Sequence, residues 1–283
     1  MSAKKLPEPL VVSFVSDLMS AVRIQNAALQ AGYELKQIAS ADEIAPPSHN
    51  APEKQAAEPV FGQTAVLVDK LTSWQPALLI FDLTNEAIPW REWLAKLKSG
   101  PATRRFPIIC FGPHVQVTML EEAQARGADA VLARSRFFSS LSDLIAKHAH
   151  QPDRAGIAAD CQESLSADGR HGLEEFNRGD YFEAHEYLED AWRDDDGAAR
   201  NLYKGVLQVA VAYLQIERQN YMGAVKMFLR ARQWLEPLPD RCRGIDIGQL
   251  RADAEAIREA LVALGPDRIG EFDRSLFKPV DFQ

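Results

Sequence analysis

The chain has 283 residues, of which 46% are hydrophobic and 25% are charged. This is the composition of a soluble globular protein long enough for two domains. Residues 151–283, with 17 Lys and Arg against 25 Asp and Glu, carry the whole net charge of −8. Such an acidic half is atypical of nucleic-acid-binding domains, and no uncharged apolar run could span a membrane. Neither nucleic acid nor a membrane is therefore expected as a partner.

The cysteines and the N-terminal residues indicate the cellular compartment in which the protein is expected. Cys110, Cys161 and Cys242 are too few and too scattered for a disulfide framework or a thiolate zinc site. The apolar run at residues 10–15 is too short for a secretory signal. A reducing compartment is therefore expected, and with it a cytoplasmic location.

Residues 1–148 are predicted to form an α/β domain. Short apolar runs typical of strands alternate with helical patterns, at 10–15, 33–38, 76–82, 107–111 and 130–133. Residues 42–60 contain four prolines and are expected to form a disordered surface excursion. The alternation predicts a parallel sheet with helices on both faces. Ligands bind such sheets at the carboxyl ends of the strands, where Asp17 and Asp82 stand.

Two runs in this half, Leu78-Leu-Ile-Phe-Asp82 and Ala123-Gln-Ala-Arg-Gly-Ala-Asp-Ala-Val-Leu132, resemble the receiver domain of two-component response regulators. The resemblance covers roughly residues 8–148. It implies a flavodoxin-like fold, with Asp82 as phospho-acceptor and Asp17 as one of the acids that hold Mg²⁺.

The chain departs from the receiver pattern at three positions. It has Ser16 where a second acid is expected, Gly112 where a hydroxyl side chain is expected, and Arg134 in place of the lysine. An arginine cannot supply the same compact ammonium. We therefore expect Asp17, Asp82 and Arg134 to form a vestigial site in a pseudo-receiver that serves docking or dimerisation. The alternative is a working phospho-switch through Asp82, the one case in which Mg²⁺ is expected.

Residues 149–165 show no clear period and are predicted to be a linker, and residues 166–283 an all-helical domain. Helical patterns cover 167–178, 181–193, 197–219, 221–235 and 247–264. The segment 206–216 is apolar on every side and should be central. Two stretches, 178–184 and 218–224, repeat at an offset of 40 residues and resemble tetratricopeptide hairpins. The apolar tail at 276–282 is expected to dock onto the bundle.

One segment concentrates unusual residues: Gly172-Leu-x-x-Phe-Asn-x-Gly-x-Tyr-Phe-Glu-Ala-His185-Glu-x-Leu-Glu189-x-x-Trp192, which we call the signature segment. With the following Lys204-Gly-Val-Leu-Gln208-Val-Ala210, it resembles the family named domain of unknown function 309, over about residues 168–240. The resemblance implies an all-helical fold and no established reaction.

His185, Glu189 and Trp192 share one helix face. Gln208 lies in the apolar central helix, where an unpaired buried amide costs about 1–3 kcal/mol. We therefore predict that these four residues form a polar cluster that locks neighbouring helices, with Gln208 facing His185 or Glu189.

The alternative is a catalytic or metal site at His185, Glu186 and Glu189. Di-iron bundles use Glu-x-x-His pairs, but here the order is reversed and the later helices offer no second histidine. No metal or other cofactor is therefore expected; His185 and Glu189 are the candidate ligands if a metal binds. The sequence favours a non-enzymatic regulatory or scaffold protein that binds a protein partner or forms a homodimer. A small enzyme using the His185 group is the alternative.

Overall fold

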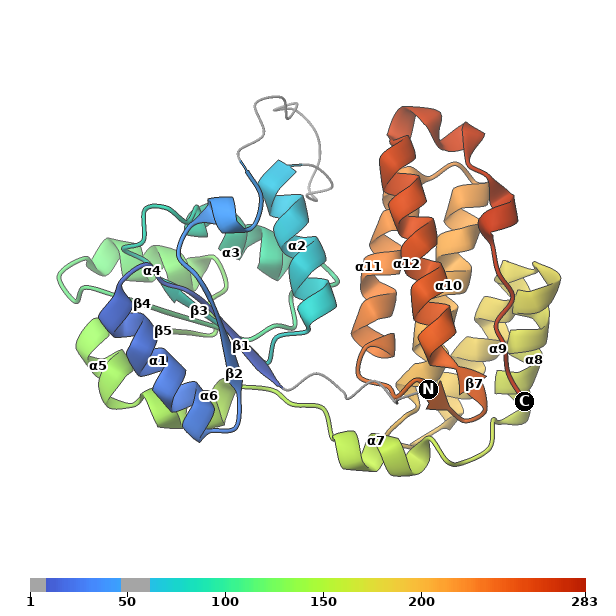
Figure 1. The fold of residues 1–283 in the computed structure, drawn as a ribbon, viewed down its shortest axis with the longest axis horizontal. Helices are drawn as coiled ribbons and strands as arrows, with labels where there is room; N and C mark the ends of the chain where they lie inside the picture. The colour runs from blue at the N-terminus through green and yellow to red at the C-terminus, as the bar shows by residue number, and fades with distance from the viewer. Residues whose placement is uncertain (1–8, 47–61) are drawn as a thin grey trace. The chain divides into compact units, whose positions relative to one another are not determined.

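The computed structural model describes residues 9–46 and 62–283, and the chain divides into two compact units at Gln151–Pro152 (Figure 1). The first unit holds a five-stranded parallel sheet in the order β2-β1-β3-β4-β5. Its strands are β1 (Leu10–Phe14), β2 (Glu34–Ile38), β3 (Leu78–Asp82), β4 (Ile108–Gly112) and β5 (Ala130–Ala133). Every residue of β3 and β4 is buried, as expected for central strands covered on both faces.

In the described residues, the helices that cover this sheet are α1 (Leu18–Gln30), α2 (Gly62–Trp74), α3 (Trp90–Ser99), α4 (Val117–Ala125), α5 (Arg134–Ser139) and α6 (Leu141–His148). On one face, residues of α1, α5 and α6 share a core with β4, where Phe137 stacks on Phe111. On α3, Trp93 packs edge-on against Phe14. This flavodoxin-like arrangement confirms the predicted fold class of the first unit. The predicted excursion at 42–60 lies mostly outside the described residues, and its start overlaps a 3-10 helix, Ala41–Glu43.

The second unit is a helical bundle, which confirms the predicted class. Its helices are α7 (Arg154–Asp160), α8 (Ala167–Arg178), α9 (Tyr181–Asp194), α10 (Asn201–Glu217), α11 (Tyr221–Leu235) and α12 (Ile247–Leu264). Gly179 ends α8 in the left-handed conformation, with φ at 87°. Asp180 and Asn220 then cap α9 and α11 in the same way, each accepting a hydrogen bond from a backbone N–H three residues on. Helix α10 is buried along most of its length, as predicted.

The C-terminal tail docks on this bundle, as predicted. The ring of Phe277 stacks on Tyr213, with the centroids 4.2 Å apart. The side-chain amide of Asn177 pairs with the backbone of Val280 in both directions, at 2.7 and 2.9 Å. Short 3-10 helices at Pro266–Glu271 and Arg274–Leu276 precede the docked residues.

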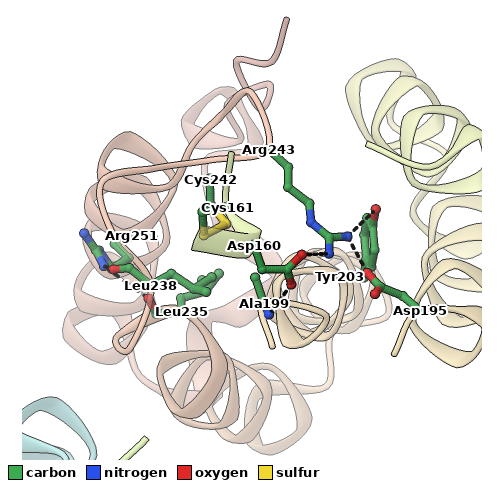
Figure 2. The surroundings of a disulfide bond; sticks show 10 residues. All are labelled: Asp160, Cys161, Asp195, Ala199, Tyr203, Leu235, Leu238, Cys242, Arg243 and Arg251. Carbon is green, nitrogen blue, oxygen red and sulfur yellow. Dashed lines mark hydrogen bonds and ion pairs between the residues drawn. A yellow bond between two sulfur atoms is a disulfide. The ribbon is translucent and has the colours of Figure 1, made fainter. Parts of the chain in front are cut away.

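Two short elements were not predicted, and both meet at a disulfide. Helix α7 lies within the segment predicted to be a linker, and a two-stranded hairpin, β6 (Arg241–Cys242) and β7 (Ile245–Asp246), precedes α12. A disulfide joins Cys161, which follows α7, to Cys242 of β6 (Figure 2). The expectation that the scattered cysteines stay unpaired is therefore wrong for Cys161 and Cys242. The cysteine content no longer supports a reducing compartment. Cys110 is free and buried in β4.

Arg243 reinforces this junction from the residue beside the disulfide. Its guanidinium pairs with Asp160 at 2.8 Å and with Asp195, and it donates to the Tyr203 hydroxyl at 3.2 Å (Figure 2). Asp160 also accepts a hydrogen bond from the backbone N–H of Ala199. Only 6% of the Arg243 side chain is exposed, so its two acids neutralise a cation that water cannot reach. The entry helix α7 is thus fastened to the bundle both covalently and by charge.

Candidate functional site

The carboxyl edge of the sheet brings Asp82 and Arg134 together. Asp82 ends β3, and Arg134 directly follows β5, two strands away in the sheet. The arginine side chain reaches across β4, with its guanidinium 5.0 Å from the centroid of the Phe111 ring. Its Nη2 lies 2.9 Å from Asp82 Oδ1 and 2.8 Å from Oδ2. Asp82 is 3% exposed, so this ion pair is nearly dry on the acid side.

Thr84 also forms hydrogen bonds with the Asp82 carboxylate. Its backbone N–H and its hydroxyl both donate to Asp82 Oδ1, at 3.0 and 2.6 Å. The Thr84 hydroxyl in turn accepts a hydrogen bond from Arg134 Nη2 at 2.9 Å. The two carboxylate oxygens are therefore engaged by neighbours of the same unit, and a charge-assisted network of this kind holds its geometry.

Asp17, the expected metal acid, has a different role. Its side chain caps α1 by accepting from the backbone N–H of Ser20 at 2.8 Å. Hydrogen bonds from the hydroxyl and backbone of Ser20 lower the pKa of Asp17. The Ser20 hydroxyl also accepts from Arg134 Nη1 at 3.2 Å. The structure thus links Asp17 and Asp82 through Ser20 and Arg134.

These residues do not fit the Mg²⁺ that the receiver resemblance implies. Mg²⁺ needs oxygen ligands in near-octahedral geometry. Ser16 provides no carboxylate, and the guanidinium of Arg134 already contacts both oxygens of Asp82. In the part of the chain that the structure describes, no three His, Cys, Asp or Glu side chains are grouped to hold a metal ion.

In the helical unit, the signature segment spans α8 and α9 and presents His185 between two acids. Its Nδ1 lies 2.9 Å from Glu186 Oε1, and its Nε2 lies 3.8 Å from Glu189 Oε2. Glu189 also pairs with Arg193 at 3.0 Å. About 30% of the His185 side chain is exposed, so this face of α9 is open to solvent.

Gln208 does not join His185 and Glu189 in the predicted polar cluster. This residue is 7% exposed, and its Oε1 makes no hydrogen bond within residues 9–46 and 62–283. No hydrogen bond between Gln208 and His185 or Glu189 is present in these described ranges. The predicted contact across the helix interface is therefore not formed.

The structure instead joins the signature segment to α10 and α11 through Lys204. The ammonium of Lys204 lies 3.5 Å from the ring centroid of Trp192 on α9 and 5.0 Å from that of Trp234 on α11. Arg200, the N-cap residue of α10, lies 4.8 Å from the Trp192 ring. We call these four residues the indole–cation cluster. Two cations on an indole are held by its π face, a contact worth about 0.5–2 kcal/mol each.

The electrostatic surroundings of Lys204 are mainly positive. Burial, together with the like charges of Arg200 and Arg230, lowers the pKa of Lys204, and Glu189 acts in the opposite direction. Within the described ranges, Lys204 Nζ has no carboxylate at ion-pair distance, and its interactions are those with the two indoles. The indole N–H groups of Trp192 and Trp234 are buried and unpaired in the same part of the chain.

Gly205 explains how α10 and α11 approach closely enough to form the cluster. A Cβ at this position would lie 2.3 Å from Leu235 Cδ2 and 3.5 Å from Trp234 Cβ. The absent side chain lets α11 pack directly on α10, which brings Trp234 beside Lys204. Sequence reasoning found Trp192 and quoted Lys204 but missed Trp234. The spacing i, i+4, i+8 is the signal that places Lys204 and Gln208 on one face of α10, with Arg200 at the N-cap on the same side.

Comparison with known proteins assigns the two halves separately. Residues 170–227 match the family described as Domain of unknown function (DUF309). The DUF309 region therefore contains the whole signature segment, with Lys204 and Gln208, and ends before Trp234. An uncharacterized protein of Aquifex aeolicus (strain VF5) is 29% identical over 98 residues, which are 34% of this chain and 27% of that protein. The uncharacterized protein YpuF of Bacillus subtilis (strain 168) is 33% identical over 85 residues, 29% of this chain and 49% of YpuF. The chain thus spans less than half the length of either relative.

The first unit matches receiver domains in fold. A phosphorylated cyanobacterial phytochrome response regulator, RcpA, aligns with 50% of this chain and 94% of its own, at 15% identity and a TM-score of 0.36. The receiver domain of a histidine kinase from Syntrophus aciditrophicus aligns with 50% of this chain and 89% of its own, at 14% identity and a TM-score of 0.38. The match of residues 170–227 confirms the resemblance inferred for the helical half, and the strand order of the first unit is the flavodoxin-like one expected. No helix in the described ranges is long and apolar enough to cross a membrane.

Proposed function

We propose that the protein is a non-enzymatic regulatory or scaffold protein, in which a pseudo-receiver is joined to a helical interaction domain. The observation that carries the proposal is the engagement of both Asp82 oxygens by Arg134. A phospho-acceptor needs one free carboxylate oxygen for attack and another for the metal ion. The Arg134 guanidinium withholds both oxygens of the buried Asp82, so the unit keeps the fold of a receiver while its acid serves structure.

The helical unit supplies the binding surface in this proposal. Consecutive helices from α8 to α11 pack on one another, and the caps at Asp180 and Asn220 repeat at the start of α9 and α11. These features support tetratricopeptide-like hairpins, an architecture that serves protein recognition. The partner is a protein, or a second copy of this chain in a homodimer. The proposal involves no cofactor.

Acetyl phosphate with Mg²⁺, followed by intact-mass measurement, tests the pseudo-receiver. We expect the full-length protein to stay unmodified under conditions in which an active receiver domain, run in parallel, is phosphorylated. Arg134→Lys is the matched variant, because it keeps the charge and removes the fork-shaped guanidinium. One added phosphoryl group on the wild-type chain that is absent in Asp82→Asn would overturn the proposal and establish a phospho-switch.

Metal analysis tests the remaining alternative at His185. We expect no stoichiometric transition metal in the purified protein. A tightly bound equivalent that disappears in His185→Ala, while Tyr187→Phe on the same helix retains it, would establish a metal protein instead.

A further inference from the structure

The indole–cation cluster holds a cation that the fold positions but does not neutralise. Lys204 lies over two indoles, which fix its ammonium without providing an acceptor oxygen. An exposed lysine would be satisfied by water, but Lys204 is partly buried. A partly desolvated ammonium gains more than an exposed one from an anion placed beside it.

The neighbouring charges increase this preference. Arg200 is the N-cap residue of the same helix, four positions before Lys204, and shares the Trp192 ring with it. Its ion pair with Asp196 is loose, at 3.8 Å, and Asp196 is fully exposed. Such surface pairs contribute little to stability, so Arg200 can turn to another anion at small cost.

Glu189 does not form an ion pair with Lys204. Glu189 acts on Lys204 through its field, but its carboxylate contacts Arg193 at 3.0 Å and lies 3.8 Å from His185. The cluster is therefore a local positive site within a unit whose total charge is −8. This contrast distinguishes it from a general basic surface of the kind that binds nucleic acid.

We propose that Lys204 and Arg200 bind an oxyanion, a carboxylate or a phosphate group, against the rings of Trp192 and Trp234. Ammonium and guanidinium groups together provide charge-assisted hydrogen bonds to such a group. The anion is either an acidic side chain of a protein partner or a small free anion. The first source deepens the proposed interaction role and rests on it, whereas the second does not.

Binding to the full-length protein tests this site directly. Trp192 and Trp234 report through tryptophan emission, and calorimetry gives the affinity independently. The probes are acetate, inorganic phosphate and a hexaglutamate peptide, each titrated at constant ionic strength. We expect saturable binding of at least one probe, weakened about tenfold or more in Lys204→Met, which keeps the aliphatic stem on the indoles.

The control is Lys278→Met, which makes the same charge change on the exposed tail and should bind as the wild type does. Tighter binding of the peptide than of both small anions identifies a partner's acidic segment. Tighter binding of phosphate identifies a free phosphate compound. No saturable binding of any probe, or equal binding by Lys204→Met, overturns the proposal.

If circular dichroism shows that Lys204→Met does not fold, Arg200→Gln is used in its place to test the site. This variant should weaken binding several-fold and leave the indole–lysine contacts intact. Equal binding by Arg200→Gln in that case overturns the site. None of these results depends on the chemistry of Asp82, so the site and the pseudo-receiver can fail separately.

Discussion

Arg134 in the receiver-like unit and Lys204 in the helical unit are both partly buried cations, but their partners differ. Arg134 contacts both oxygens of a buried carboxylate, whereas Lys204 contacts two aromatic rings and no acid in the described ranges. The helical unit can neutralise a cation fully, as Arg243 shows with Asp160 and Asp195. The open charge of Lys204 is therefore specific to its place on α10. A closed pair serves the fold, and an open cation remains available for binding.

The largest loss of stability is expected on reduction of the disulfide. Because this bond lies in the helical unit, its reduction should affect that unit and leave the receiver-like unit unchanged. The disulfide closes a loop between residues 81 apart in sequence, for which loop entropy predicts a loss of about 4–5 kcal/mol on reduction. Urea unfolding with and without reductant should show this loss in the helical unit. The receiver-like unit, followed by an amide-exchange readout, should not respond. A Cys161→Ser/Cys242→Ser variant that remains sensitive to reductant would contradict this assignment.

The second largest loss of stability is expected on removing the Arg243 side chain. Arg243→Met leaves Asp160 and Asp195 partly buried without their ion-pair partner and should cost about 3–5 kcal/mol in urea unfolding. Arg241→Met is the control, since that side chain is exposed and its ion pairs are loose, at 3.8 and 3.9 Å. A loss below about 1 kcal/mol would show that the fastening of α7 does not depend on this charge.

The same group gives a pH dependence. Burial alone raises the pKa of Asp195, but hydrogen bonds from Arg243 and Gly197 outweigh it and lower the pKa below its ordinary value of 3.8. The contribution of Asp195 to stability is therefore present above pH 3.8 and is lost as the pH falls through the lower folded-state pKa. Unfolding measured across this range should be less pH-dependent in Arg243→Met than in the wild type.

A smaller loss is expected at Arg134. Arg134→Met leaves Asp82 buried and unpaired, which should cost about 2–3 kcal/mol, less than a fully buried pair because the arginine is about one third exposed. The double variant Asp82→Asn/Arg134→Met should recover part of this loss in urea unfolding. Arg136→Met, an exposed change in the same helix, is the control. Equal stability of Arg134→Met and the wild type would mean that the pair does not hold this edge together.

The smallest effect is expected at Lys204. Lys204→Met keeps the stem on the indoles and loses only the cation–π contribution, about 0.5–1 kcal/mol. Thermal or urea unfolding measures it. A loss above about 2 kcal/mol would make Lys204 a structural group like Arg134, and the contrast between the two cations would disappear.

Elements with a long, clear hydrophobic period could be predicted from the sequence. Strands β1, β3 and β4 and helices α8 to α12 were found because each buries an apolar pattern, and β2 and β5 followed from the alternation of strands and helices. Helix α7 and the β6–β7 hairpin were missed because they are short, and their stability comes from the disulfide and Arg243. An isolated pair of cysteines carries no sequence signal of its connectivity.

The candidate sites could be predicted only in part from the sequence. Asp82 and Arg134 both follow strand ends, so the sheet topology alone brings them to one edge. Trp234 could not be assigned to Lys204, because the contact depends on how closely α11 approaches α10 at Gly205. Gln208 was expected to find a partner in His185 or Glu189, but the turn of α10 that faces α9 presents Lys204 to Trp192 instead.

The bond between Cys161 and Cys242 also has a topological consequence. The whole DUF309 region, residues 170–227, lies within the covalent ring that this bond closes, as do Trp192 and Trp234. A protease cut anywhere inside the ring leaves both fragments attached until a reductant is added. A mechanical pull transmitted along the chain from residue 151 reaches β6 through two sulfur atoms and bypasses helices α8 to α11. Helices α8 to α11 therefore stay joined after such a cut and do not carry the load.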